Sequence, residues 1–295
     1  MEYICIDCPR KCNVKKQPDK PSGVCGSSSV PVIARAALHF GEEPCISGTR
    51  GSGAVFFSGC SLKCVFCQNT EISQSIKGKP VDKRHFAEIL MRLQDEGAHN
   101  INLVTASHHT RFVAEVLSRV KPDIPVIWNS SGYESVESLR MLEGLIDVYL
   151  PDYKYSSAAL AEKYSSAPDY PSAAAEAIKE MFRQTGSFTL DENGIVKKGV
   201  IIRHLLLPGQ AENCMNAIDF AADEFPEGSI CFSLMSQFVP CGKAFDYPEL
   251  CRPVSRDEYE NMKHYLLNSR IIHGYWQEPD SATRDFIPAF DGTGV

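Results

Sequence analysis

The sequence predicts an α/β protein built on a mostly parallel sheet. From about residue 54 onward, six short apolar runs of strand length alternate with segments of helical periodicity. The runs are apolar on both faces, which is typical of parallel strands that are covered on both sides. Strands that alternate with helices are joined by right-handed crossovers, so the sheet is either open and doubly wound or curled into a barrel.

The predicted elements follow in chain order. The apolar runs predict strands at 54–58, 101–105, 125–129, 146–151, 200–207 and 230–236. Two apolar stripes at helical spacing predict the first two helices, one with Phe86, Ile89, Leu90 and Leu93 and one with Phe112, Val113, Val116, Leu117 and Val120. Further helices are expected at 134–144, 157–164, 171–185, 211–224 and 255–268. The segment DENG at 191–194 predicts a hairpin-like turn before the fifth strand.

Composition places the chain among ordinary globular proteins. Its 295 residues are 43% hydrophobic, which suffices for a sizeable core, and 30 basic against 37 acidic residues leave a net charge of -7. This balance argues against a broad nucleic-acid or anionic-lipid footprint. No apolar run approaches the roughly 18 to 20 residues of a membrane span, and the start MEYICIDCPRKC lacks the apolar core of a signal peptide. We therefore expect a cytoplasmic protein with no membrane partner.

Two regions are expected along the chain. Residues 1–50 are rich in Cys, Pro, Gly, Ser and Lys and lack sustained periodicity, so they are interpreted as a small cysteine-rich, metal-binding extension organised by its ligands. Residues 51–295 carry the α/β pattern. The last segment, DFIPAFDGTGV, combines apolar anchors with a glycine-rich end and is interpreted as a cover over the open side of a partial barrel.

Twelve cysteines in a cytosolic chain favour metal binding over disulfides. Cys60, Cys64 and Cys67 form a C-x3-C-x2-C segment directly after the first predicted strand, where an α/β fold gathers its ligands. Thiolates suit iron-sulfur clusters or zinc, but a structural zinc site is normally closed by a fourth protein ligand. A cluster held by three thiolates instead leaves one iron open to a small molecule. The alternatives are three buried structural cysteines, or a zinc site completed by a distant histidine.

This C-x3-C-x2-C segment after a first strand resembles the signature of the radical SAM superfamily, and Phe66 matches the aromatic residue that the family often has before the last cysteine. The resemblance implies a partial (β/α)6 TIM-like barrel and a [4Fe-4S] cluster whose open iron binds S-adenosylmethionine. It also implies reductive cleavage of this cofactor to a 5'-deoxyadenosyl radical, which abstracts a hydrogen atom from a substrate.

A narrower resemblance extends over nearly the whole chain. The segments EEPCISGTRGSGAVFFSGCSLKCVFCQN (42–69), WNSSGYESVESLRMLEGLIDVYLPDYKY (128–155), RHLLLPG (203–209) and SLMSQF (233–238) are similar to homologues of pyruvate formate-lyase activating enzyme. This resemblance implies an oxidoreductase that acts on a glycine of a partner glycyl radical enzyme and receives its electron from a donor such as flavodoxin or ferredoxin.

Polar residues that follow the second and third predicted strands are candidates for binding the cofactor. Thr105, Ser107 and His108 stand where the activases carry a Gly-Gly-Glu motif that binds the methionyl amino group, so the sequence departs from the family here. Asn129 and Ser130 suit a ribose or a carboxylate by size and hydrogen-bonding capacity, or they cap the helix that follows.

Charged residues follow the next two strands. Asp152 and Lys154 are similar to the activases' Asp-Leu-Lys, whose Asp and Lys contact the cofactor, whereas a pair on the surface would contribute little. Arg203 stands among apolar residues, where an unpaired charge is costly. It either binds the cofactor's carboxylate bidentately, as the matching arginine of the activases implies, or pairs with an acidic side chain. His204 is interpreted as a packed or capping residue on the opposite face. Gln237 is a weaker candidate for the adenine or the substrate side of the site.

A second set of cysteines, near the amino terminus, is complete in itself. The spacing C-x2-C-x3-C-x12-C supplies four thiolates, which predicts a structural zinc site, a second [4Fe-4S] cluster or, as the third alternative, no metal, on Cys5, Cys8, Cys12 and Cys25. Cys214 and Cys231 are interpreted as packed core thiols, and Cys45 as a packed thiol or an alternative ligand. Cys241 and Cys251 flank a loop that contains Pro and Gly, and they are interpreted as incidental, with a substrate-side or a reactive role as the alternatives.

The sequence thus predicts a radical SAM enzyme whose substrate it does not identify. The activase role is the named option, and another peptide, an RNA or a small molecule is the alternative within the same chemistry. A zinc or iron-sulfur binding module without turnover is the hypothesis from a different class of protein.

Overall fold

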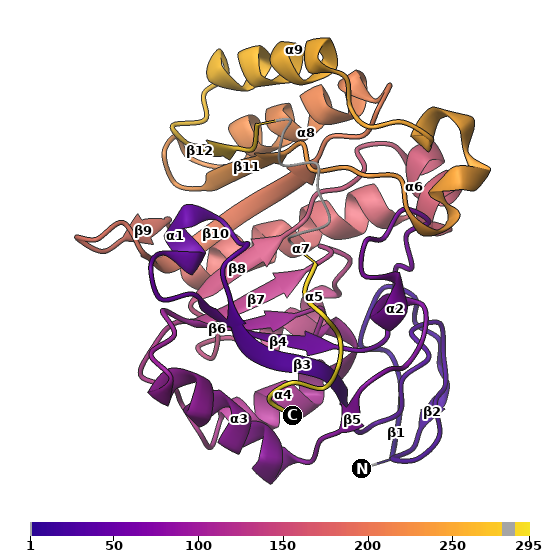
Figure 1. Ribbon diagram of the computed structural model, residues 1–295, viewed down its shortest axis with the longest axis vertical. Helices are drawn as coiled ribbons and strands as arrows, with labels where there is room; N and C mark the ends of the chain where they lie inside the picture. Colours follow the sequence, from indigo (N-terminus) through magenta and orange to yellow (C-terminus); the bar gives the residue numbers. More distant parts are fainter. Residues whose placement is uncertain (1, 279–286) are drawn as a thin grey trace.

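The structure is a computed structural model that describes residues 2–278 and 287–295. Its main element is a ten-stranded sheet in the order β12-β11-β10-β8-β7-β6-β4-β3-β5, with the short strand β9 paired to β10 (Figure 1). This mixed α/β architecture with a largely parallel sheet confirms the predicted fold class at that level. Among the described residues the terminal strands β5 and β12 do not pair with each other, so hydrogen bonds do not close the sheet into a complete barrel.

All six predicted strands are present, and they lie parallel to one another. Leu103, Trp128 and Tyr149 lie side by side on three neighbouring strands, which shows how the register aligns the large apolar residues. The six strands are β4 (Ser52–Phe57), β6 (Ile101–Val104), β7 (Val126–Ser130), β8 (Val148–Pro151), β10 (Val196–Leu205) and β11 (Cys231–Met235).

Several strands were not predicted. β3 (Val32–His39) pairs antiparallel with β4, and β12 (His273–Trp276) pairs parallel with β11. The sequence VIARAALH contains small alanines and a charge, and HGYW is half exposed, so neither forms an apolar run. β3 comes from residues 1–50, so the sheet includes part of the predicted extension. The other short strands are β5 (Lys79–Pro80), beside β3, and β9 (Thr189–Leu190), which forms the predicted turn at 191–194 with β10.

The predicted helices all form. α5 is shorter than expected, and the four-residue helices α1 (Pro44–Ser47) and α2 (Thr70–Ser73) were not predicted. The Asp82 side chain accepts from the backbone N of His85 and thereby caps the first long helix. These helices are α3 (Lys83–Asp95), α4 (Thr110–Leu117), α5 (Val136–Arg140), α6 (Ala158–Ser165), α7 (Tyr170–Thr185), α8 (Ala211–Glu224) and α9 (Arg256–Leu267).

The two faces of the sheet have different neighbours. One face carries residues such as Val55, Leu103 and Trp128, which form the main core together with the helices. The opposite face carries residues such as Phe56 and Ile127, which form two smaller clusters. Because side chains alternate along a strand, Asn129 shares this second face with Ile127. The second face is therefore the one on which polar side chains can meet.

The two ends of the described chain pack differently. Near the amino terminus, β1 (Tyr3–Ile4) and β2 (Lys15–Lys16) form a separate two-stranded sheet. At the carboxyl end, residues 287–295 run beside β3 (Figure 1), where Gly292 N donates to Ala34 O at 3.0 Å and Ala36 N donates to Thr293 O at 2.9 Å. Residues 285 and 286 of the predicted cover segment lie outside the described residues. None of the described helices is both long and apolar enough to span a membrane.

Candidate functional site

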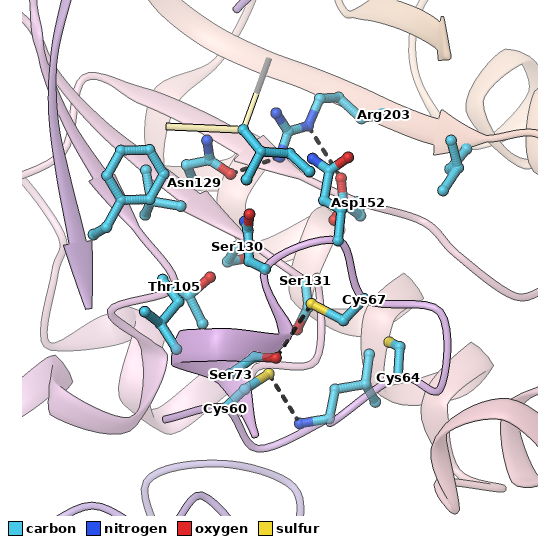
Figure 2. Close-up of a pocket in the computed structure, with 18 of the residues that line it drawn as sticks. Cys60, Cys64, Cys67, Ser73, Thr105, Asn129, Ser130, Ser131, Asp152 and Arg203 are labelled. Carbon is cyan, nitrogen blue, oxygen red and sulfur yellow. Dashed lines mark hydrogen bonds and ion pairs between the residues drawn. The ribbon is translucent and has the colours of Figure 1, made fainter. Parts of the chain in front are cut away.

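A cavity of about 210 Å³ lies at the carboxyl ends of the parallel strands. Residues from loops that are far apart in sequence meet there because these strand ends share one edge of the sheet (Figure 2). Nine of the predicted site residues line this cavity: Cys60, Cys64, Cys67, Thr105, Asn129, Ser130, Asp152, Lys154 and Arg203.

The three-cysteine loop begins where β4 ends. Gly59 has a φ of +90°, and a Cβ at this position would lie 2.7 Å from the backbone oxygen of Cys25. Only glycine therefore fits between the loop and the amino-terminal segment. The tight turn directs the chain into the cavity, and Cys60 follows at once.

Each of the three sulfur atoms accepts one hydrogen bond. Ser73 Oγ donates to Cys67 Sγ at 3.2 Å, as Figure 2 shows, and Ser165 Oγ donates to Cys64 Sγ at 3.1 Å. Leu62 N donates to Cys60 Sγ at 3.4 Å. Hydrogen bonds of this kind stabilise thiolates that bind iron and tune the potential of a cluster.

Burial affects the protonation of thiols in the three-cysteine loop. Burial and, to a smaller extent, the neighbouring Cys64 raise the pKa of the Cys67 thiol to about 12. A buried thiol with so high a pKa is protonated at neutral pH, but a bound metal deprotonates a coordinating thiol. Across residues 2–278 and 287–295, no three His, Cys, Asp or Glu side chains converge closely enough to hold one metal ion.

A network of charged side chains forms the wall opposite the cysteines. Lys154 Nζ lies 2.5 Å from Asp152 Oδ2, and Arg203 Nε donates to Asp152 Oδ1 at 3.0 Å. Arg203 also donates to Asn129 Oδ1 at 2.6 Å and to Glu42 Oε2 at 3.1 Å. Asp152 thus holds both cations in place.

The pKa shifts in this network follow from its charges. Burial alone would raise the pKa of Asp152, but the charges of Lys154 and Arg203 outweigh it and lower this pKa. Burial disfavours the charged form of Lys154, yet Asp152 and then Cys64 raise its pKa. Asp152 is therefore a carboxylate and Lys154 an ammonium at neutral pH.

The position of Arg203 bears on its two predicted roles. Its Nε, Nη1 and Nη2 atoms each donate to a side chain of the protein, two of them to carboxylates. In this structure Arg203 therefore pairs with the acidic side chains of Asp152 and Glu42, which is the second of its two predicted roles. Lys154 has two ammonium protons beyond the one directed at Asp152, so it is better placed to contact a ligand carboxylate.

Ser107 and His108 do not line the cavity. Ser107 Oγ donates to the buried Glu134, and the Nε2 atom of His108 lies 2.9 Å from Ser58 O. Burial lowers the pKa of His108 to about 4. Both side chains face away from the cavity because they belong to the 3-10 turn that continues into α4, so the structure does not support contacts between them and a ligand there.

Thr105 does line the cavity, in an unusual backbone conformation. Its φ is +60°, which a β-branched residue rarely adopts, and its N donates to Asn129 O at 2.8 Å. The backbone therefore has the conformation that glycine adopts without cost, although the residue is threonine.

Asn129 and Ser130 lie at the end of β7, inside the cavity. The alternative that they cap the next helix is wrong, because α5 begins at Val136 and its N-cap is Ser135, which accepts from Ser138 N. Gln237 also lines the cavity. His204 is fully buried with its Nδ1 2.6 Å from Tyr153 O, which is the packed position predicted for it.

Sequence reasoning missed Glu42. Its Oε1 accepts from Asn102 Nδ2 at 3.0 Å and from Asn129 Nδ2 at 3.1 Å, while Oε2 accepts from Arg203. β3 is antiparallel to β4, so its carboxyl end lies beside Ser52, at the opposite edge of the sheet from the cysteine loop. The rule that sites form at the carboxyl ends of parallel strands therefore does not point to Glu42. The doublet Glu42-Glu43 before Pro44 was the available signal.

The other cysteines lie in varied surroundings. Cys45, Cys214 and Cys231 are buried, as expected of packed thiols. Cys251 is exposed, whereas Cys241 lines the cavity and donates to Phe66 O at 3.3 Å. Cys241 therefore lies in the same cavity as Cys60, Cys64 and Cys67, and the substrate-side alternative for this residue stays a prediction.

The three-cysteine loop at the end of the first parallel strand lies in a region that is similar to a known family of iron-sulfur domains. Residues 47–163 match a family model described as "4Fe-4S single cluster domain". The match includes Cys60, Cys64 and Cys67 and supports a [4Fe-4S] cluster on these thiolates. Arg203 and the amino-terminal cysteines lie outside it.

The chain belongs to the same family as the Methanocaldococcus jannaschii protein "Uncharacterized protein MJ0674", to which it is 30% identical over 266 residues, 87% of this chain and 72% of the relative. Among solved structures, the crystal structure of Streptococcus suis SuiB is similar with a TM-score of 0.44 and 14% identity, over 75% of this chain. The aligned region covers 47% of the SuiB chain, so this protein spans about half of its length.

Proposed function

We propose that this protein is a radical SAM enzyme, in which a [4Fe-4S] cluster on Cys60, Cys64 and Cys67 binds and reductively cleaves S-adenosylmethionine. The observation that supports this most is the position of the three thiols in one cavity with Lys154, Asp152 and Asn129. A cluster held by three thiolates leaves one iron without a protein ligand, and the polar wall offers groups that suit an amino acid and a ribose.

The residues of the chain have separate tasks in this proposal. When bound, the cluster would supply the electron that cleaves S-adenosylmethionine into methionine and a 5'-deoxyadenosyl radical. Lys154 pairs with the cofactor's carboxylate, and Asp152 holds Lys154 in position. Asn129, fixed by Glu42, presents its amide to the sugar. Phe56, Phe238 and Ile287 supply apolar lining that limits access of water.

The test is cleavage of the cofactor by the anaerobically reconstituted protein. With dithionite and S-adenosylmethionine, the wild type should form 5'-deoxyadenosine, and Cys64→Ala should form neither the cluster nor this product. If a [4Fe-4S] spectrum is present but no 5'-deoxyadenosine appears, the enzyme proposal fails and a non-enzymatic binding module is the better description.

Cys241→Ala is the matched control, because this cysteine lies in the same cavity. If S-adenosylmethionine is the fourth ligand, the variant should retain about four irons at this site and its cleavage activity. Loss of the cluster in this variant would show that Cys241 is the fourth ligand, and the open iron would then be absent.

The finer proposal concerns the substrate. The resemblance to pyruvate formate-lyase activating enzyme homologues favours a glycine in a partner enzyme, which would lose a hydrogen atom to the 5'-deoxyadenosyl radical. The electron that reduces the [4Fe-4S] cluster would come from flavodoxin or ferredoxin. The absence of the Gly-Gly-Glu motif favours another peptide, an RNA or a small molecule. A candidate substrate deuterated at the reacting carbon should transfer deuterium into 5'-deoxyadenosine, and an activated partner should show a glycyl radical by electron paramagnetic resonance.

A further inference from the structure

The amino-terminal cysteines lie directly against the three-cysteine loop. Cys25 O is so close to Gly59, the residue before Cys60, that a Cβ there would lie 2.7 Å from it. Arg10, between Cys8 and Cys12, donates from Nε to Ser61 O at 2.9 Å. The two cysteine sets are therefore in contact through their backbones.

Arg10 strengthens this contact from a second side. Its Nη2 donates to Ser165 O at 2.7 Å, and its Nη1 donates to Ser166 O. Ser165 is the residue whose hydroxyl donates to Cys64 Sγ. The Arg10 guanidinium thus joins the amino-terminal segment to the three-cysteine loop and to Ser165, the residue that donates a hydrogen bond to Cys64.

The chemistry of the amino-terminal set suits a metal centre. Cys5, Cys8 and Cys25 are buried and Cys12 is partly exposed. Four thiolates can hold either a zinc ion or a [4Fe-4S] cluster, and of these two only the cluster can accept an electron and pass it on.

Lys16 supplies an independent observation. Its side chain is fully buried, and Nζ donates to Cys25 Sγ at 3.2 Å as well as to Ser22 O, Ser27 O and Ser27 Oγ. Burying an ammonium without a negative partner is costly. Asp7, the buried carboxylate of this segment, is already paired with Arg111 at 2.8 Å. The negative charge beside the Lys16 ammonium therefore has to come from the Cys25 thiolate, together with whatever this thiolate binds.

We propose that Cys5, Cys8, Cys12 and Cys25 bind a second [4Fe-4S] cluster, with the Lys16 ammonium as its buried counter-ion. A [4Fe-4S] cluster with four thiolate ligands carries a net negative charge, so it would supply the negative partner that the buried Lys16 ammonium otherwise lacks. The position of the set beside Cys60 suits transfer of one electron. A low-potential one-electron donor reduces the amino-terminal cluster, and this electron passes to the cluster on Cys60, Cys64 and Cys67. No atoms move in this step, and the transfer rests on the function proposed above.

The cluster itself is tested in the variant Cys60→Ala/Cys64→Ala/Cys67→Ala, which lacks the ligands of the catalytic site. After anaerobic reconstitution this variant should retain about four irons and four sulfides per chain and show a reduced-cluster signal with dithionite. Zinc in the protein as purified, or a chain without metal after reconstitution, would overturn the proposal. Because this variant needs no turnover, the result is independent of whether the wild type cleaves S-adenosylmethionine.

Lys16→Met in the same triple variant tests the counter-ion. Removing a buried positive charge favours the more oxidised cluster, so the midpoint potential should become more negative while the iron content stays at about four. Lys15→Met is the matched control, since Lys15 is the exposed neighbour on β2 and pairs with Glu2. Equal potentials in the Lys16 and Lys15 variants would contradict the role of Lys16.

Electron transfer is tested with Cys5→Ala/Cys8→Ala in the otherwise wild-type chain. Reduced flavodoxin should reduce the cluster on Cys60, Cys64 and Cys67 more slowly in this variant than in the wild type. In this variant the iron content should fall from about eight to about four per chain. If the reduction rate nevertheless stays unchanged, the relay is excluded, and the amino-terminal cluster has a structural role. If this variant does not fold, the triple variant still decides whether the amino-terminal cluster exists.

Discussion

At the scale of single residues, the site depends on how two buried cations share the carboxylates around them. Arg203 is held by Asp152, Glu42 and Asn129. The Lys154 ammonium donates to Asp152, its one hydrogen-bonded side chain within 2–278 and 287–295, and lies beside Cys64. A ligand carboxylate that bound Arg203 would have to displace protein groups. Lys154 can accept such a ligand without breaking its ion pair.

Replacing Lys154 should therefore weaken cofactor binding. In Lys154→Met, the loss of a charged hydrogen bond of about 1.5–3 kcal/mol should weaken the affinity for S-adenosylmethionine roughly 10- to 100-fold. Equilibrium binding to the reconstituted protein measures this, and Lys163→Met, which breaks a pair with Glu249 at the surface, is the control. Unchanged affinity with full iron content would show that Lys154 does not contact the cofactor.

Thr105 offers a prediction about backbone strain. A positive φ at a β-branched residue costs about 1–3 kcal/mol, and glycine adopts it freely. The free energy of unfolding of Thr105→Gly should therefore be higher than that of Thr189→Gly by about 1–3 kcal/mol. Thr189 lies in the exposed strand β9 and is absent from the residues with positive φ. Chemical denaturation of both variants provides the comparison, and equal losses would mean that Thr105 is unstrained.

At the scale of elements, a buried carboxyl group joins the loops that follow β6 and β7. Glu134 Oε1 accepts from Ser107 Oγ and, at 3.1 Å, from Trp128 Nε1. Burial raises the pKa of Glu134 to about 7, although its hydrogen bonds to Ser107, Trp128 and Ser130 act in the opposite direction. The loop that carries Thr105 is thus anchored by a group that titrates near neutral pH.

This shift predicts a pH dependence of stability. A carboxyl group whose pKa is raised in the folded state binds its proton more tightly there, so folding loses stability as pH rises from about 4.5 to about 7. Glu134→Gln keeps an acceptor for both donors and removes the titration. Its stability relative to the wild type should increase by roughly 3 kcal/mol over this range and then level off.

Denaturation midpoints of Glu134→Gln and the wild type at a series of pH values measure the effect. Glu137→Gln is the control, because Glu137 is exposed on α5, and the gain with pH should be larger for Glu134→Gln than for this variant. A flat difference for Glu134→Gln would mean that Glu134 stays ionised in the folded protein.

At the scale of the whole molecule, the carboxyl-terminal segment completes the sheet face that bears the cavity. Phe290 is buried and lies 5.5 Å from the ring of Phe56, while Ile287 and Pro288 line the cavity. The last residues also bond to the backbone of β3. The carboxyl-terminal segment and the residues around the end of β3, which include His39 and Glu42, therefore enclose the same site.

Phe290→Ala should destabilise the protein by about 3–5 kcal/mol through loss of a buried aromatic ring. It should also weaken the binding of S-adenosylmethionine, because the segment that bears Ile287 and Pro288 loses its anchor. Thermal unfolding and ligand binding measure the two effects. Ile272→Ala, at a side chain that is 60% exposed, should change stability by no more than about 0.5 kcal/mol. Equal effects of the two substitutions would show that Phe290 is not an anchor.

The six parallel strands, the helices between them and the three-cysteine loop were predictable because each leaves a local pattern. Apolar runs mark buried strands, helical stripes mark the helices that cover them, and close spacing marks cysteines that share a ligand. The same reasoning located Asn129, Asp152, Lys154 and Arg203 at strand ends. It missed β3 and β12, whose half-exposed or alanine-rich sequences leave no such pattern.

Sequence by itself therefore determined the class of fold, the three-cysteine loop and the edge of the sheet at which the cavity forms. Only the tertiary structure decided which polar side chains enter the cavity, since Ser107 and His108 turn toward Glu134 and Ser58 while Glu42 enters from a strand that was not recognised. Tertiary structure also brought Cys25 against Gly59 and buried Lys16 beside it. The physical reason is that strand and helix patterns are local, whereas pairing of charges and contact between loops depend on residues far apart in the chain.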